Sequence, residues 1–162
     1  MAATVNKNGV HDPCRYFPAK TARAILGVEV ATANNRPAPP ALLSDVCQYS
    51  NALLPNAGPE RSVFVQLDHA KRGATSPTDP GFRKVPGARW EPTTLKTGGR
   101  RTRAWWVSTP NGPGIKAPSR SHFVMAWTPG FTVGASSIGM KHPRAVAEKA
   151  AAAVIRNLPD QS

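Results

Sequence analysis

The chain has 162 residues and carries 21 lysines and arginines against 9 acidic residues, a formal net charge of +12. Its apolar content of 40% is typical of one globular domain and argues against a disordered or fibrous protein. No apolar run approaches the roughly 20 residues that a membrane-spanning helix needs, which argues against a transmembrane protein. The 17 prolines and 13 glycines predict many turns and long irregular connections.

The N-terminal part of the chain predicts a tail and then a short helix. Residues 1–11 are polar and unpatterned, so we expect a flexible tail ahead of a single domain over residues 12–159. The segment 17–27 predicts a helix of about two turns, because Pro18 suits a first turn and Gly27 suits a left-handed cap. A helix this short must pack against another element to be stable.

Strands are predicted where β-branched and aromatic residues alternate with polar ones. The predicted strands cover residues 28–33, 46–50, 62–68, 102–108, 122–128 and 131–136. The last two flank Pro129-Gly130, which makes them the clearest candidate for an antiparallel hairpin.

The C-terminal segment 143–158 predicts the strongest helix of the chain. It begins with Pro143, is rich in alanine, and ends before Pro159. These elements together predict an α+β fold, with an antiparallel sheet of about five to six strands. We expect the short N-terminal helix and the Ala-rich C-terminal helix to pack on one face of that sheet, with the other face solvated.

The two cysteines, Cys14 and Cys47, lie 33 positions apart. A structural zinc site needs four ligands in close pairs, and the histidines are scattered singly, so we expect no metal site. Two alternatives remain, a disulfide or two buried reduced cysteines. We favour the disulfide, which would stabilise this chain by roughly 3–4 kcal/mol. It would indicate a periplasmic or extracellular protein, with an export or lipoprotein signal missing ahead of Met1.

Several short motifs together resemble a known family. They are Asp12-Pro13-Cys14, the helix over 17–27 with its Leu-Gly end, and Cys47-Gln48-Tyr49-Ser50. They are similar to the uncharacterised exported lipoprotein domains common in actinobacteria, in which a hydrophobic strand (here 131–136) leads to an Ala-rich helix (here 143–158). The resemblance implies a Cys14–Cys47 pair and an extracytoplasmic α+β domain, distantly like the sensor domains of mycobacterial transmembrane kinases. It brings no established catalytic residue.

The middle of the chain departs from that family. The segment 85–90 keeps little of the family's Gly-x-Gly-Asp-x-Ala stretch, and Phe17 replaces the usual Ser or Thr helix cap. Because of these departures, the motifs do not support a ligand-binding surface in common with that family.

A basic segment in the middle of the chain is the main candidate for a binding surface. Residues 70–101 show no periodicity and predict a long loop. Between Gly81 and Arg103 there are seven basic residues and one acidic residue, which is half of the net charge. Trp105 and Trp106 should point to opposite faces of a strand. The candidate residues for binding an anion or a partner are Arg83, Lys84, Arg89, Lys96, Arg100, Arg101, Arg103, Trp90 and Trp106. The alternative is a solvated surface with tryptophans in the core.

No catalytic motif is recognisable. Asp68-His69 and Ser136-Ser137 contain the residue types of a hydrolase but lack a nucleophile elbow, and no phosphate-binding loop is present. We therefore expect a non-enzymatic protein without a cofactor. An enzyme would require His69 or His122 within hydrogen-bond reach of Ser136 or Ser137.

These patterns lead to one functional hypothesis and one alternative. The first is an exported envelope domain that binds an anionic cell-envelope component or another envelope protein through its basic, Trp-containing surface. The alternative is a cytoplasmic nucleic-acid-binding protein that uses the same surface.

Overall fold

The computed structural model describes residues 13–36, 44–69, 87–110, 120–128 and 131–158. Three helices and seven strands are found in these ranges. In chain order they are α1 (Pro13–Tyr16), α2 (Ala19–Leu26), β1 (Ala31–Arg36), β2 (Ser44–Ser50), β3 (Ser62–His69), β4 (Arg89–Thr97), β5 (Arg100–Pro110), β6 (Arg120–Thr128), β7 (Phe131–Ile138) and α3 (Pro143–Asn157).

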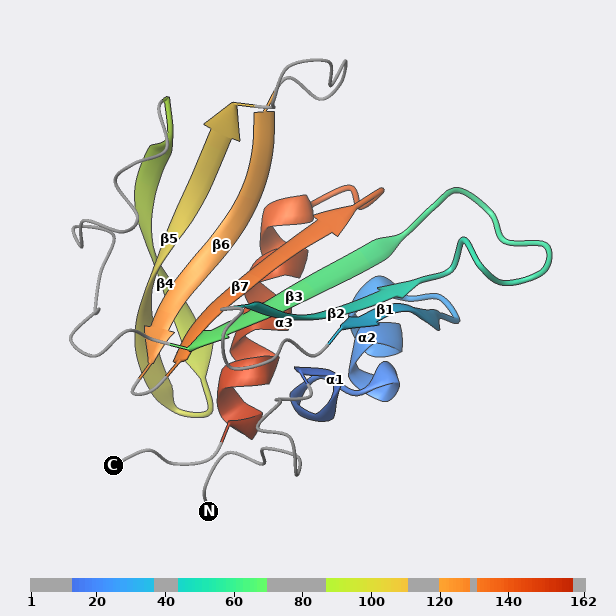
Figure 1. Ribbon diagram of the computed structural model, residues 1–162, viewed down its shortest axis with the longest axis horizontal. Helices are drawn as coiled ribbons and strands as arrows, with labels where there is room; N and C mark the ends of the chain where they lie inside the picture. Colours follow the sequence, from blue (N-terminus) through green and yellow to red (C-terminus); the bar gives the residue numbers. More distant parts are fainter. Residues whose placement is uncertain (1–12, 37–43, 70–86, 111–119, 129–130, 159–162) are drawn as a thin grey trace.

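The strands form one antiparallel sheet in the order β1-β2-β3-β7-β6-β5-β4. Two meanders, β1–β3 and β4–β7, are therefore joined where β3 lies beside β7. Figure 1 shows α3 crossing one side of the sheet, with α1 and α2 next to it. The α+β class is confirmed, but the sheet has seven strands rather than the predicted five to six.

The face of the sheet that packs against the helices, called the helix face below, carries the main core. Val63, Val65 and Leu67 alternate along β3 and are buried there. Opposite them, Ala147 and Ala150 of α3 have no exposed surface. Alanines at these positions let the helix backbone approach the sheet closely, while each buried apolar group still contributes to stability.

The N-terminal helices are attached covalently to the helix face, and α2 ends in a glycine cap. A disulfide joins Cys14 of α1 to Cys47 of β2, with a Cα–Cα distance of 5.2 Å, and this confirms the favoured alternative for the two cysteines. Helix α2 ends as predicted, at Gly27 with φ 71°, and the Gly27 N–H donates to the Arg23 carbonyl oxygen. The short α1 was not predicted.

Strand β4 corrects the prediction of a loop over residues 70–101. Residues 89–97 form a strand that pairs along its whole length with β5. Its central Pro92 concealed this, because proline interrupts a strand pattern. Proline is tolerated here because β4 is the edge strand, where one side needs no backbone donor. Residues 70–86 lie outside the described residues.

Strand β1 begins three residues later than predicted. The sequence indicated a strand over 28–33, whereas the ladder with β2 runs from Ala31 to Arg36. Val28 and Val30 instead pack against the main core. Burial of their side chains, rather than strand pairing, explains their apolar character.

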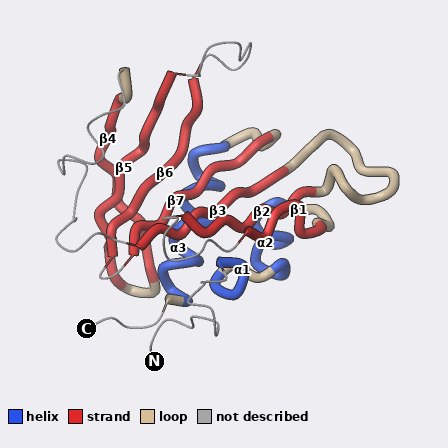
Figure 2. The backbone as a smooth tube through the Cα atoms, viewed as in Figure 1, coloured by secondary structure: helices blue, strands red, loops and turns tan. Residues whose placement is uncertain are grey.

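The connection between β2 and β3 is drawn as a long loop in Figure 2. Polar contacts organise its base. The Asn51 side chain donates to the Pro59 carbonyl oxygen at 3.1 Å and accepts from the Arg61 N–H at 2.7 Å. Arg61 Nη1 donates to the Leu26 carbonyl oxygen, which ties the connection to the end of α2. The loop base and α2 are therefore held as one unit.

Candidate functional site

Strand alternation divides the tryptophans of β5 between the two faces of the sheet. Trp106 pairs with Val124, and Val124 is part of the main core, so Trp106 lies on the helix face. Trp105 pairs with Met125 and belongs to a separate cluster. Trp105 therefore lies on the opposite side of the sheet, called the outer face below, and the prediction that the two rings diverge is confirmed.

The outer face of β4, β5 and β6 carries an aromatic cluster. Its buried members are Val107, Met125 and Trp127, and its partly buried members are Trp90, Trp105 and Phe123. The Trp105 and Trp127 rings meet edge to face, with centroids 5.1 Å apart and planes at 84°. The Trp90 ring lies 6.4 Å from Trp127 at 44°. The rings are thus mutually tilted rather than stacked.

A group of three cations continues the same face toward the β4–β5 turn, and it is called the basic end below. Lys96 pairs with Arg101 across the hairpin, and Arg103 follows two residues later, so all three alternate to the outer face. Their side chains are exposed. The Arg103 guanidinium carbon lies 5.5 Å from the Trp105 ring centroid, within the range of a cation–π contact. This contact joins the basic end to the aromatic cluster.

The charge of this face is not offset within the three strands. The only acidic residue in β4, β5 and β6 is Glu91. Glu91 pairs with Trp106 and therefore belongs to the helix face. The outer face of these described strands thus combines cations and aromatic rings without a carboxylate.

The structure brings together only part of the candidate set from the sequence. Lys96, Arg101, Arg103 and Trp90 share the outer face. Arg89 and Trp106 lie on the helix face, because they pair with Ser108 and Glu91. Arg100 begins β5 opposite Thr97, at the hairpin end. Arg83 and Lys84 lie outside the described residues.

Two members of the outer face were missed as site residues. Trp105 and Trp127 are the centre of the aromatic cluster. For Trp105 a signal was available, since it shares odd-numbered alternation with Arg101 and Arg103 in one strand. Trp127 could only be found from the register between strands.

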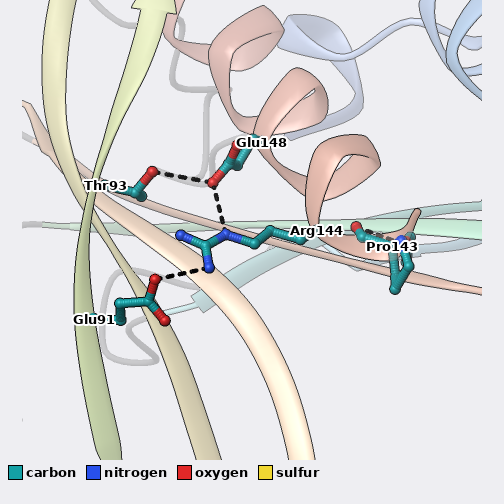
Figure 3. Close-up of polar contacts among 6 residues, drawn as sticks. Glu91, Thr93, Pro143, Arg144 and Glu148 are labelled. Atoms are coloured by element: carbon teal, nitrogen blue, oxygen red, sulfur yellow. Dashed lines mark hydrogen bonds and ion pairs between the residues drawn. The ribbon is translucent and has the colours of Figure 1, made fainter.

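On the helix face, a clamp of charged residues joins β4 to α3 (Figure 3). Arg144 Nη1 donates to Glu91 Oε1 at 2.9 Å, and Arg144 Nε donates to Glu148 Oε1 at 3.3 Å. Thr93 Oγ1 donates to the same Glu148 oxygen at 3.1 Å. The Arg144 side chain also lies over the Trp106 ring at 5.5 Å. We call Arg144, Glu91, Glu148 and Thr93 the Arg144 clamp.

Within the Arg144 clamp, the charge of Arg144 is balanced by the carboxylates that it contacts. The hydrogen bond to Glu91 is the largest influence and raises the pKa of Arg144 above its ordinary value. Burial lowers this pKa, and the hydrogen bond to Glu148 and the two negative charges raise it. One arginine thus faces two carboxylates. Next to it, a shallow depression of about 420 Å³ is lined by α3 and the residues before it, among them Lys141, His142 and Glu148. The contacts of the Arg144 clamp therefore have a structural role, which is to link the edge strand β4 to α3.

The residues considered for hydrolytic chemistry lie apart. His69 pairs with Phe131, whereas Ser136 pairs with Phe64, five residues away along β3. The His122 ring stacks on Trp106, with centroids 6.2 Å apart. Ser137 Oγ donates to the Pro143 carbonyl oxygen. Within the described part of the chain, no group of three or more His, Cys, Asp or Glu residues could hold a metal ion.

Comparisons with known proteins add no identification. No family model, curated protein or solved structure matches the chain. The resemblance to exported lipoprotein domains stays a prediction. The Cys14–Cys47 disulfide suggests an oxidising, extracytoplasmic environment. None of the helices in the described ranges is long and apolar enough to cross a membrane.

Proposed function

We propose that the protein is a non-enzymatic domain of the cell envelope that binds an anionic ligand on the outer face of β4, β5 and β6. One observation carries the proposal. Arg103 lies over Trp105, and the same face holds Lys96 and Arg101 without a carboxylate in these strands. Three like charges on one face, with no carboxylate in these strands, create a positive potential that attracts anions.

The whole chain supports attraction of an anion before contact. A net charge of +12 on 162 residues raises the rate at which polyanions encounter the surface, and salt screens that attraction. The basic end then gives the encounter a defined position, because its three cations share one face of one hairpin. The net charge of the chain therefore governs the rate of association, and the outer face determines where the anion binds.

The disulfide favours an envelope ligand over nucleic acid. Cationic and aromatic surfaces also bind single-stranded nucleic acid, so the surface alone does not separate the two ligand classes. Disulfides persist in oxidising compartments and are rare in cytosolic and nuclear proteins, which are the ones that meet most cellular nucleic acid. We therefore place the ligand in the cell envelope.

Retention on immobilised polyanions tests the proposal. The variant with Arg101→Glu and Arg103→Glu is compared with Lys20→Glu and Lys149→Glu, a matched control with the same change in net charge at two exposed positions of α2 and α3. On both polyphosphate and heparin supports, we expect the first variant to elute at much lower salt than the control. The reason is that only the first variant reverses the charge of the outer face.

Two results would contradict the proposal. Equal elution of the two variants would show that net charge alone governs retention, and the outer face would then not be a site. Loss of folding is checked by comparing the melting temperatures of both variants with that of the unmodified protein. A single-stranded DNA that binds more tightly than either polyanion, with a steep salt dependence, would favour the nucleic-acid alternative.

A further inference from the structure

The outer face presents charge and aromatic surface along one line. Arg101, Arg103 and Trp105 occupy alternate positions of β5, and each step of two residues along an antiparallel strand covers roughly 7 Å. The line therefore runs from the β4–β5 turn, through two cations, onto the aromatic cluster. A small anion would contact only its first part.

At the Trp105 end of this line, the aromatic cluster extends the surface onto the neighbouring strands. Trp105 is flanked by Pro92 on β4 and Met125 on β6, and Trp90 and Trp127 lie within ring contact of one another. Trp90 and Trp105 are half-buried, so part of each ring remains accessible. A ligand that covers both ends must therefore offer negative charge at one end and apolar surface at the other.

The angles between the tryptophan rings indicate which kind of apolar surface a ligand must offer. Successive bases of a single strand stack on the faces of aromatic side chains. Here Trp105 and Trp127 stand at 84° and Trp90 and Trp127 at 44°, so the rings do not form a series of parallel platforms. The C–H groups of a sugar ring, in contrast, pack on the face of a single accessible aromatic ring, so a sugar does not require a series of parallel rings.

We infer that the ligand is an acidic polysaccharide, whose sugar rings lie on the aromatic cluster while its carboxylate, sulfate or phosphate groups reach Lys96, Arg101 and Arg103. This inference rests on the proposed function and specifies the chemical class of its ligand. Thr94 is exposed opposite Arg103, where its hydroxyl can exchange hydrogen bonds with those of a sugar.

Calorimetric titration with defined oligomers tests the inference. The probes are hexagalacturonate, digalacturonate, fully methyl-esterified hexagalacturonate and polyphosphate. We expect hexagalacturonate to bind at least about tenfold more tightly than digalacturonate, since only the longer chain reaches both ends of the line. The esterified chain keeps its rings but loses its charges, and we expect no measurable binding of it.

The variant Trp105→Ala separates the ring contribution from the charge contribution. We expect it to weaken hexagalacturonate binding about tenfold and to leave polyphosphate binding within about twofold. The matched control is Trp106→Phe on the helix face, which should change neither. If Trp105→Ala does not fold, the fluorescence of the unmodified protein decides. A change with hexagalacturonate but not with polyphosphate supports the inference, and an equal change with both overturns it.

The remaining outcomes distinguish the two proposals. If Trp105→Ala leaves hexagalacturonate binding intact while the reversal of Arg101 and Arg103 abolishes it, the polysaccharide inference is wrong and the anion-binding function stands. If a single-stranded oligonucleotide binds more tightly and Trp105→Ala weakens it, nucleic acid replaces the polysaccharide. If no polyanion binds the unmodified protein, both proposals fail.

Discussion

At the centre of β5 and β6, the two faces of the sheet carry side chains of different size. On the helix face, Ala104 lies opposite Ala126. One residue along, on the outer face, Trp105 lies opposite Met125. Helix α3 brings its own apolar stripe to the first face, so small strand residues leave room for it. On the second face, the strands' own large side chains bury one another.

This difference shows how one sheet can serve two purposes. The helix face obtains stability from close approach of backbone to backbone, which needs alanine and tolerates little change in volume. The outer face obtains its cluster from rings that remain partly accessible, which suits contact with a ligand. The predictions below test this division, beginning with the largest expected effect.

Removal of the disulfide should destabilise the helix face most. The variant Cys14→Ser with Cys47→Ser frees α1 from β2, and the loss of a closed loop of this length costs about 3–4 kcal/mol. We expect the melting temperature to fall by about 6–16 °C, measured by circular dichroism. Reduction of the unmodified protein is the control and should give a similar shift. An unchanged melting temperature would show that packing alone holds the N-terminal helices.

Enlargement of an alanine on the helix face should come next. Ala150 is fully buried in α3, so Ala150→Leu forces the helix away from the sheet and should cost about 1–3 kcal/mol. Ala145→Leu, at an exposed position of the same helix, should change stability by less than about 0.5 kcal/mol. Chemical denaturation measures both. Equal effects would contradict the claim that α3 approaches through its alanines.

Shortening of a cation on the outer face should have a smaller effect. Arg103→Ala removes a cation–π contact with Trp105 at an exposed position, and we expect a loss of about 0.5–1 kcal/mol in the free energy of unfolding. Arg23→Ala in the exposed part of α2 provides a comparison without a ring contact. A loss above about 2 kcal/mol would indicate that the outer face is structural rather than a surface for ligands.

The smallest effect is expected at the Arg144 clamp. A double-mutant cycle of Arg144→Gln and Glu91→Gln measures the coupling of the half-exposed pair, and surface pairs of this kind contribute about 0.2–1 kcal/mol. Both the coupling and the effect of salt are read from denaturation at low and high ionic strength. A coupling that does not weaken with salt would show that the pair is more shielded than its exposure indicates.

Elements with local signals could be predicted from the sequence. Pro143 and the alanine-rich stretch after it predicted α3, and Gly27 predicted the end of α2. The pairing of β6 with β7 followed from two alternating segments on either side of a short turn. In each case the information lies within a few residues of the element.

The remaining features depend on contacts between distant residues. Pro92 hid β4, and only its place at the edge of the sheet explains why a proline is tolerated there. Alternation predicted that Trp105 and Trp106 diverge, but the register with β6 decides which ring faces α3. The spacing of Arg144 and Glu148 was a local signal for a side-chain pair, whereas the contact with Glu91 was not.

The pairing of β3 with β7 has a consequence for the order of events during synthesis. The β3–β7 ladder pairs Ser62 with Ile138, so it cannot form until Ile138 has been synthesised. The Cys14–Cys47 bond requires only residues up to β2. During synthesis, which begins at the N-terminus, the edge of β3 that later pairs with β7 is unpaired for a time. Unpaired strand edges can pair with other chains and cause aggregation. Slow synthesis of the second meander would prolong this interval, so a chaperone that shields β3 should raise the yield of folded protein.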